Sequence, residues 1–102
     1  MPKRISILGS TGSIGVNSLE VISHLKNKLE VIYLTAHRNA DLLVQQALKF
    51  KPKAICISDE SKYNDVKRQL NNTSIKIYQG REGLLEIASR DDVDIMLNGL
   101  VG

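Results

Sequence analysis

Three glycines at regular spacing lie near the amino terminus and could form a binding site for an anion. They are Gly9, Gly12 and Gly15, and they follow directly on the apolar run of residues 5–8. The first can adopt a positive φ at a turn, the second lets backbone approach a ligand closely, and the third lets a helix pack tightly on the strand. The first N–H groups of such a helix lack intrahelical acceptors and would face the anion. The spacing therefore predicts a cradle for the phosphates of a nucleotide.

The residues between these glycines add further polar groups. We predict that Ser10, Thr11 and Ser13 supply hydroxyl and N–H groups around a pyrophosphate, and that Ile14 forms a wall beside it. Ser13 is also a candidate for the N-cap of the helix. The spacing is GxxGxxG and not the more common GxGxxG, so the location between a strand and a helix carries the prediction.

A second candidate site follows the apolar run of residues 31–34, in residues 35–39. In a dinucleotide site that selects NAD, an acidic residue here accepts hydrogen bonds from the ribose hydroxyls and repels a 2′-phosphate. This chain has no acid there, and Arg38 offers a guanidinium that can hold a phosphate through two parallel N–H donors. We therefore predict a preference for NADP(H). Two interpretations of His37 stay open. It contacts the adenine or the 2′-phosphate, or it is a surface histidine without a role in binding.

Five short apolar runs alternate with segments of helical spacing, which is typical of βαβ units. The runs cover residues 5–8, 31–34, 54–57, 75–78 and 94–97. Helices are expected over residues 14–25, from Asn39 to just before Pro52, over 60–70 and over 82–88. Parallel strands joined by right-handed crossovers bind ligands at their carboxyl ends. The expected fold is α/β, a Rossmann-like doubly wound parallel sheet in three layers, αβα.

Local signals define the helix ends and faces. Asn39 is a good N-cap for the second helix, and either Ser58 or Asp59 is expected to cap the third. One face of the first helix is expected to be mostly apolar, through Ile14, Leu19, Val21, Ile22 and Leu25.

The composition fits one globular domain, with 102 residues, 42% hydrophobic and 25% charged. The net charge of +3 is mild and the lysines are scattered, which argues against nucleic acid as a partner. The single cysteine, Cys56, lies in an apolar run and is expected to be a buried, inert thiol. No apolar stretch approaches the roughly 18 residues of a membrane span, and Met1 leaves no room for a signal peptide. We expect a cytoplasmic protein.

Few side chains outside the two turns could do chemistry. His24 and His37 have no carboxylate or thiol at metal-ligand spacing, so no metal site is predicted in this chain. Asp91 and Asp92 are interpreted as a solvated turn and Asp94 as the start of a strand. No catalytic residue is assigned.

These motifs together resemble the opening of the 1-deoxy-D-xylulose 5-phosphate reductoisomerase family. Residues 7–15 are similar to its first glycine turn, and residues 36–39 resemble its Ala-Gly-x-Asn turn, with His37 in place of the glycine. Residues 99–102 resemble its Ala-Ile-Val-Gly turn, which lines the cofactor cleft. The resemblance implies these cofactor-binding residues: Gly9, Ser10, Thr11, Gly12, Ser13, Ile14, His37, Arg38, Asn39, Gly99, Leu100 and Val101.

The resemblance also implies an activity for a longer parent protein. That enzyme would be an NADPH-dependent oxidoreductase of the non-mevalonate isoprenoid pathway, which converts 1-deoxy-D-xylulose 5-phosphate to 2-C-methyl-D-erythritol 4-phosphate. Its divalent metal (Mg, Mn or Co) and its sugar-phosphate substrate would be bound by residues beyond this chain. Residues 1–102 are thus expected to be the NADPH-binding domain, an N-terminal piece of a homodimeric enzyme that is inactive by itself.

Two other interpretations stay open. Aspartate-semialdehyde dehydrogenases and extended sugar epimerases open with a similar glycine turn, and their catalytic residues would also lie downstream. A stand-alone nucleotide-sensing module would need only the two turns. A downstream acidic metal-binding cluster would favour the reductoisomerase.

Overall fold

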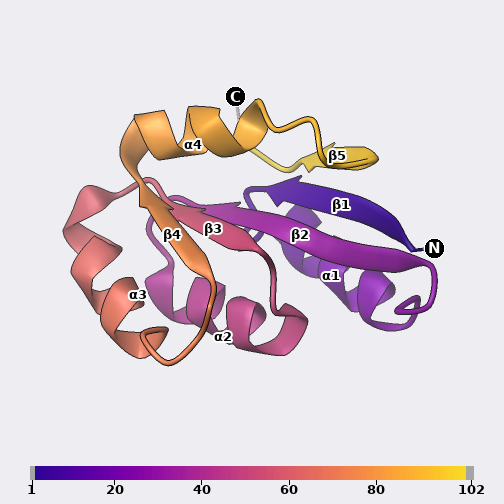
Figure 1. The fold of residues 1–102 in the computed structure, drawn as a ribbon, viewed down its shortest axis with the longest axis horizontal. Coiled ribbons are helices and arrows are strands. Elements are labelled where there is room, and N and C mark those ends of the chain that lie inside the picture. Colours follow the sequence, from indigo (N-terminus) through magenta and orange to yellow (C-terminus); the bar gives the residue numbers. More distant parts are fainter. Residues whose placement is uncertain (1, 101–102) are drawn as a thin grey trace.

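A parallel sheet of five strands forms the centre of the molecule (Figure 1). The computed structural model describes residues 2–100. The strands follow the order β4-β3-β2-β1-β5, and each neighbouring pair is parallel. Their bounds are β1 Lys3–Leu8, β2 Leu29–Ala36, β3 Ala54–Ile57, β4 Lys76–Gln79 and β5 Ile95–Asn98.

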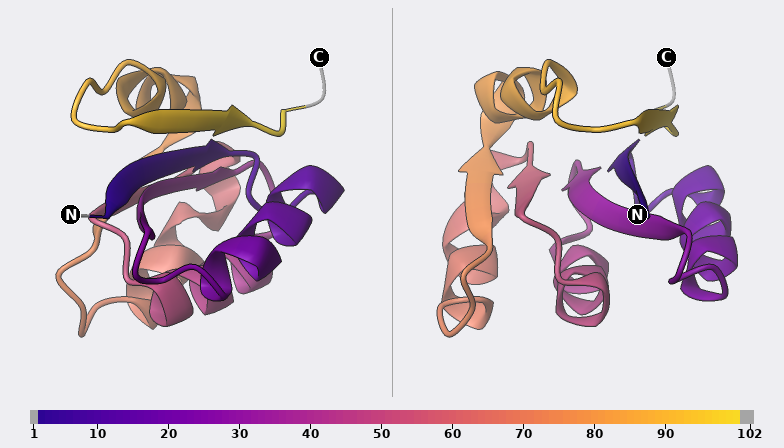
Figure 2. Two further views of the ribbon diagram at one scale, coloured as in Figure 1. Left: turned by 90° about the vertical axis from the view of Figure 1, so that its right-hand side faces the viewer. Right: turned by 45° about the vertical axis from the view of Figure 1, so that its right-hand side comes forward.

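Helices cover both faces of this sheet. They are α1 Ser13–Ser23, α2 Ala40–Phe50, α3 Tyr63–Gln69 and α4 Gly80–Ala88, with a short 3₁₀ helix, η1 Glu60–Lys62, before α3. The helices α1, α2 and α3 lie on one face, and α4 crosses the other (Figures 1 and 2). Because α4 carries the chain from β4 to the opposite edge, β5 joins the sheet beside β1. The predicted doubly wound, three-layer αβα fold is confirmed, with its topological switch next to β1, where such folds bind ligands.

Two apolar cores fill the layers. The larger one lies between the sheet and α1 to α3 and includes Leu34, Leu43 and Ile55, and the smaller one lies under α4 and includes Cys56 and Ile87. Central strands buried on both faces have continuous apolar sequences, which explains why these runs showed no alternation. Burial raises the pKa of the Cys56 thiol to about 12, so the prediction of a buried, inert thiol is confirmed.

Helix ends follow the predicted signals with one refinement. The Asn39 side chain accepts a hydrogen bond from the Leu42 N–H at 3.2 Å, and α2 ends at Lys51, whose left-handed φ of 51° precedes Pro52. Asp59 caps the third helical segment by accepting from the Ser61 N–H at 3.0 Å. That short-range bond tightens the first turn, so the helix expected over 60–70 divides into η1 and α3.

The expected apolar face of α1 is partly wrong. Leu19 and Ile22 are buried, but Ile14 and Val21 are 61% and 58% exposed. The buried stripe begins at Gly15, and each residue turns the helix by about 100°. Ile14 precedes Gly15 and Val21 precedes Ile22, so both point away from the sheet.

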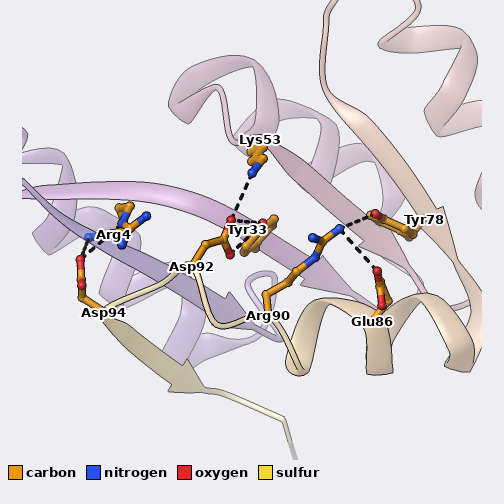
Figure 3. Close-up of polar contacts among 8 residues, drawn as sticks. All are labelled: Arg4, Tyr33, Lys53, Tyr78, Glu86, Arg90, Asp92 and Asp94. Atoms are coloured by element: carbon orange, nitrogen blue, oxygen red, sulfur yellow. Dashed lines mark hydrogen bonds and ion pairs between the residues drawn. The ribbon is translucent and has the colours of Figure 1, made fainter.

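Asp91 is exposed as expected, whereas Asp92, whose side chain is 29% exposed, also has two partners that were not predicted (Figure 3). The hydroxyl of buried Tyr33 donates to both carboxylate oxygens of Asp92, at 3.0 and 2.8 Å, and the Lys53 ammonium lies 3.1 Å away. The hydrogen bond from Tyr33, followed by that from Lys53, lowers the pKa of Asp92. Burial and the bond to Asp92 raise the pKa of Tyr33 to about 12. Tyr33 lies in the apolar run of residues 31–34, so the sequence pattern did not indicate that its hydroxyl would bind Asp92.

Further contacts attach the connection between α4 and β5 to the sheet (Figure 3). Arg90 donates to the Tyr78 hydroxyl at 2.8 Å and lies 5.9 Å from the centre of the Tyr33 ring. Asp94 lies one residue before β5 and is not the first residue of the strand as predicted, and it accepts from the Arg4 N–H at 2.8 Å. Asp92 and Asp94 thus contact residues at the amino ends of β3 and β1, opposite to the predicted cofactor site, whereas Tyr78 lies in the second half of β4.

Candidate functional site

Three turns meet at the carboxyl edge of the sheet. The turn after β1 comprises residues 9–12, the turn after β2 residues 37–39, and the segment after β5 residues 99–100. Because β1 pairs with β2 on one side and β5 on the other, the glycine turn lies between the other two. The fold thus brings together the segments that the sequence singled out.

Three glycines of this region are required by the protein's own backbone. Gly9 has a φ of 75°, and a Cβ there would lie 3.0 Å from the carbonyl group of Gly99. A Cβ on Gly15 would lie 2.5 Å from the Gly9 carbonyl oxygen, and one on Gly99 would lie 3.1 Å from that of Leu8. The separation at Gly15 is closer than packed atoms tolerate, and those at Gly9 and Gly99 would require their neighbours to shift by a few tenths of an ångström. Glycine at these positions thus lets β1, α1 and the end of β5 converge.

Gly12 is different, because the protein leaves room beside it. A Cβ there would meet the Gly9 carbonyl oxygen at 3.7 Å and the Gly99 carbonyl oxygen at 3.9 Å, which are ordinary contact distances. Its φ of −77° is open to any residue. Packing and backbone conformation therefore do not explain this glycine, whereas close approach by a bound phosphate group would.

Gly12, and not Ser13, is the N-cap of α1, so the capping role considered for Ser13 is wrong. Glycine has no side chain with which to cap the first N–H groups of the helix. Those groups are directed toward the carboxyl edge, where an anion can accept from them. Thr11 is half-buried, and Ser13 and Ile14 are exposed beside this position.

Ser10 does not present its hydroxyl to this edge as expected. It is fully buried, its hydroxyl donates to Gln46 Oε1 at 2.7 Å, and its N–H donates to the Thr35 carbonyl oxygen at 2.7 Å. Gln46 Nε2 donates in return to the Ser10 carbonyl oxygen at 2.9 Å. The roles of Gln46 and Thr35 as partners of Ser10 were not predicted. The available signal was a glutamine between Leu43 and Ala47 on the buried stripe of α2.

The turn after β2 is exposed and built from side chains. Arg38 Nε lies 3.8 Å from a carboxylate oxygen of Asp59, while the Arg38 side chain is 78% exposed. Hydrogen bonds from Ser61, and more weakly the charge of Arg38, lower the pKa of Asp59, so this carboxylate stays ionised. The contact involves Nε, which leaves the two terminal nitrogens of the guanidinium for another acceptor. His37 Nδ1 lies 2.8 Å from the Ser58 hydroxyl, and the Asn39 side chain caps α2.

The segment after β5 lies against the glycine turn. The Gly99 N–H donates to the Leu8 carbonyl oxygen at 2.8 Å. Leu100 is 44% exposed, and its N–H donates to Asn98 Oδ1 at 3.0 Å. Val101, the last residue predicted for the site, lies outside the described residues.

Within residues 2–100, no group of three or more His, Cys, Asp or Glu side chains is arranged to hold a metal ion. The helices of this described part are also too short or too polar to span a membrane. The turns after β1 and β2 offer backbone N–H donors, the hydroxyls of Thr11 and Ser13 and the exposed Arg38 guanidinium as binding groups.

Sequence comparisons agree with this architecture. The family model of 1-deoxy-D-xylulose 5-phosphate reductoisomerase matches residues 5–102. A relative with that name from Chloroherpeton thalassium is 48% identical over 98% of the chain, and one from Phocaeicola vulgatus is 45% identical over the whole chain. The chain covers only 26% and 27% of the length of these two proteins.

Solved structures give the same result. The reductoisomerase of Zymomonas mobilis in complex with NADPH has a TM-score of 0.94 at 34% identity, over 100% of this chain and 27% of that one. A reductoisomerase structure with NADPH, fosmidomycin and magnesium has a TM-score of 0.91 at 34% identity, over 98% of this chain and 25% of that one. These matches disfavour the dehydrogenase and epimerase interpretations. The two turns, their meeting at one edge and the match over residues 5–102 have one explanation: the chain belongs to the 1-deoxy-D-xylulose 5-phosphate reductoisomerase family.

Proposed function

We propose that this chain binds NADPH at the carboxyl edge of its sheet and is the cofactor domain of a longer reductoisomerase. The single observation that carries the proposal is Gly12, a glycine that the protein's own packing does not require. It borders the uncapped start of α1, where the N–H groups of residues 11–14 can bind a pyrophosphate. The NADPH complex of the Zymomonas mobilis relative supports the same choice of ligand.

The other predicted residues take different parts in this proposal. Gly9 and Ser10 shape the turn from within, while Thr11, Gly12, Ser13 and Ile14 border the pyrophosphate. Arg38 holds the 2′-phosphate through its terminal nitrogens, beside His37, and Asn39 orients the start of α2. Gly99 and Leu100 border the side of the site toward the nicotinamide, and the predicted contact of Val101 lies outside the described residues.

NADPH supplies a hydride when it is bound, and the residues of this chain bind and orient it. In the full-length protein we propose conversion of 1-deoxy-D-xylulose 5-phosphate to 2-C-methyl-D-erythritol 4-phosphate. Because residues 2–100 lack a cluster that could hold a metal ion, a divalent metal and the sugar phosphate would be held elsewhere in that protein. We further propose that the full-length protein is a cytoplasmic homodimer.

A titration followed by nicotinamide fluorescence tests the cofactor assignment. We expect saturable NADPH binding by this chain, with NADH bound roughly tenfold to a hundredfold more weakly, since one charge-assisted contact is lost. Absence of NADPH binding by folded protein would refute the proposal.

Absorbance of NADPH then tests the assignment of chemistry to the remainder of the protein. With 1-deoxy-D-xylulose 5-phosphate and a divalent metal, the full-length protein should oxidise NADPH and residues 1–102 alone should not. Turnover by residues 1–102 would show that the catalytic groups had been misplaced. Binding without turnover by the full-length protein would favour a nucleotide sensor.

A further inference from the structure

Two buried polar residues from outside the glycine turn hold its first half in place. Thr35, at the end of β2, accepts the Gly9 N–H on its hydroxyl at 3.0 Å and the Ser10 N–H on its carbonyl oxygen at 2.7 Å. Gln46, in the middle of α2, exchanges two hydrogen bonds with Ser10, at 2.7 and 2.9 Å. Thr35 and Gln46 are only 2% and 7% exposed, so these bonds are shielded from water.

The bond to the Ser10 carbonyl has a geometric consequence for the next residue. A peptide unit is planar and trans, so the Ser10 carbonyl and the Thr11 N–H point in opposite directions. With the carbonyl directed inward to Gln46 Nε2, the Thr11 N–H is directed toward the carboxyl edge.

We propose that Gln46 is a positioning residue for cofactor binding, which acts by fixing the Ser10–Thr11 peptide so that the Thr11 N–H faces the pyrophosphate. This inference rests on the proposed function. The relevant bond is the one that Gln46 donates to the Ser10 carbonyl oxygen. The bond that it accepts from the Ser10 hydroxyl holds a side chain and does not set the direction of the Thr11 N–H.

Two substitutions separate these bonds. Gln46→Met removes both at similar volume, and we expect the affinities for NADPH and NADH to fall by about tenfold each, because both cofactors carry the pyrophosphate. Ser10→Ala removes only the hydroxyl bond and should lower both affinities by a smaller factor, about threefold, because the bond to the Ser10 carbonyl oxygen remains. The exposed neighbour provides a matched control, since Gln45→Met should leave both affinities unchanged.

A lower affinity in protein that remains folded is the readout that a merely structural role would not produce. Titrations should use folded protein, verified by circular dichroism at a temperature below the unfolding transition. A general loss of stability changes the folded fraction and predicts unaltered affinities for the protein that remains folded. Wild-type affinity in Gln46→Met, or equal losses in Ser10→Ala and Gln46→Met, would overturn the inference.

A measurement on the wild type covers the case in which Gln46→Met does not fold. The Thr11 amide resonance should shift on addition of NADPH and of NADH, because its N–H would donate to the pyrophosphate of either cofactor. An unshifted Thr11 amide at saturation would overturn the inference while leaving the proposed function intact. Failure of the wild type to bind either cofactor would refute the proposed function itself.

Discussion

The turns after β1 and β2 lie side by side at the carboxyl edge, and each leads into a helix, yet they are built in opposite ways. In the glycine turn the backbone is packed against backbone, with Gly9, Gly15 and Gly99 in close contact and Ser10 fully buried. In the turn after β2, His37 and Arg38 are exposed, and Arg38 is held by one ion pair of 3.8 Å.

This difference corresponds to two parts of a cofactor. The pyrophosphate is common to NADH and NADPH, and a rigid array of N–H groups suits it because those groups need no reorganisation on binding. The 2′-phosphate distinguishes the two cofactors, and a long cationic side chain can bind it without altering the fold. Affinity should therefore depend on the first turn and selectivity on the second.

The largest effect is expected from Gly15→Ala. Its Cβ would lie 2.5 Å from the Gly9 carbonyl oxygen and from the Ser10 Cα, so α1 must shift away from the turn. We expect the free energy of unfolding to fall by about 3 kcal/mol or more. We also expect the variant to lose binding of both cofactors. Urea denaturation measures the fall in stability. Gly12→Ala is the matched control, at about 1 kcal/mol or less, because its Cβ has 3.7 Å of room. Equal losses for the two variants would contradict the distinction between these glycines.

Gly12→Val should abolish binding without unfolding the protein. A Cβ has ordinary contact distances at this position, and the branched side chain would occupy the space that a pyrophosphate needs beside the start of α1. Nicotinamide fluorescence should show no saturable binding of NADPH or NADH, while circular dichroism shows a native spectrum. Native affinity in a folded variant would mean that the phosphates bind elsewhere.

Arg38→Ala should alter selectivity and little else. Loss of one charge-assisted contact weakens binding by about 1.5–3 kcal/mol, or roughly tenfold to a hundredfold, for NADPH. NADH affinity should stay within about twofold, as calorimetry can test. Arg68→Ala, on the exposed surface of α3, controls for the loss of one positive charge. If the two cofactors lost affinity equally, Arg38 would be a surface charge without a role in selectivity.

The smallest effect on binding is expected from Asp92→Asn, at the opposite end of the sheet. The amide can still accept from Tyr33 but loses the charge that pairs with Lys53, so stability should fall by about 1 kcal/mol at pH 7. NADPH affinity of the folded protein should be unchanged. A clear loss of affinity would show that the two ends of the sheet are coupled.

The effect of Asp92→Asn should also depend on pH. Because the folded protein lowers the pKa of Asp92, its carboxylate contributes stability above the unfolded value of about 3.9. That contribution is lost as the pH falls through the lower folded value. Denaturation curves of the variant and the wild type should therefore begin to converge as the pH falls below about 4 and meet once the pH is below the lower folded value. A difference that persisted in acid would have a cause other than the charge of Asp92.

Much of the fold was predictable because its signals are local. The strand over residues 54–57 was predicted with its observed bounds, since its four residues are all buried. Asn39 and Pro52 defined the ends of α2 through capping and through the missing N–H of proline. The prediction for Ile14 and Val21 was wrong because the buried face of α1 includes Gly15. The close contact of Gly15 with Gly9 and Ser10 sets which face of the helix meets the sheet.

The sequence by itself determined the αβ alternation, the location of the glycine turn between a strand and a helix, and the basic residue after the second strand. Each depends on residue type and short spacing, so no distant contact is needed to recognise it. Only the tertiary structure decided that Ser10 faces Gln46, that Gly99 lies against Gly9, and that Gly12 alone among the three turn glycines has room beside it. These contacts join residues that are up to 90 positions apart, as Gly9 and Gly99 are, and chain folding alone sets such distances.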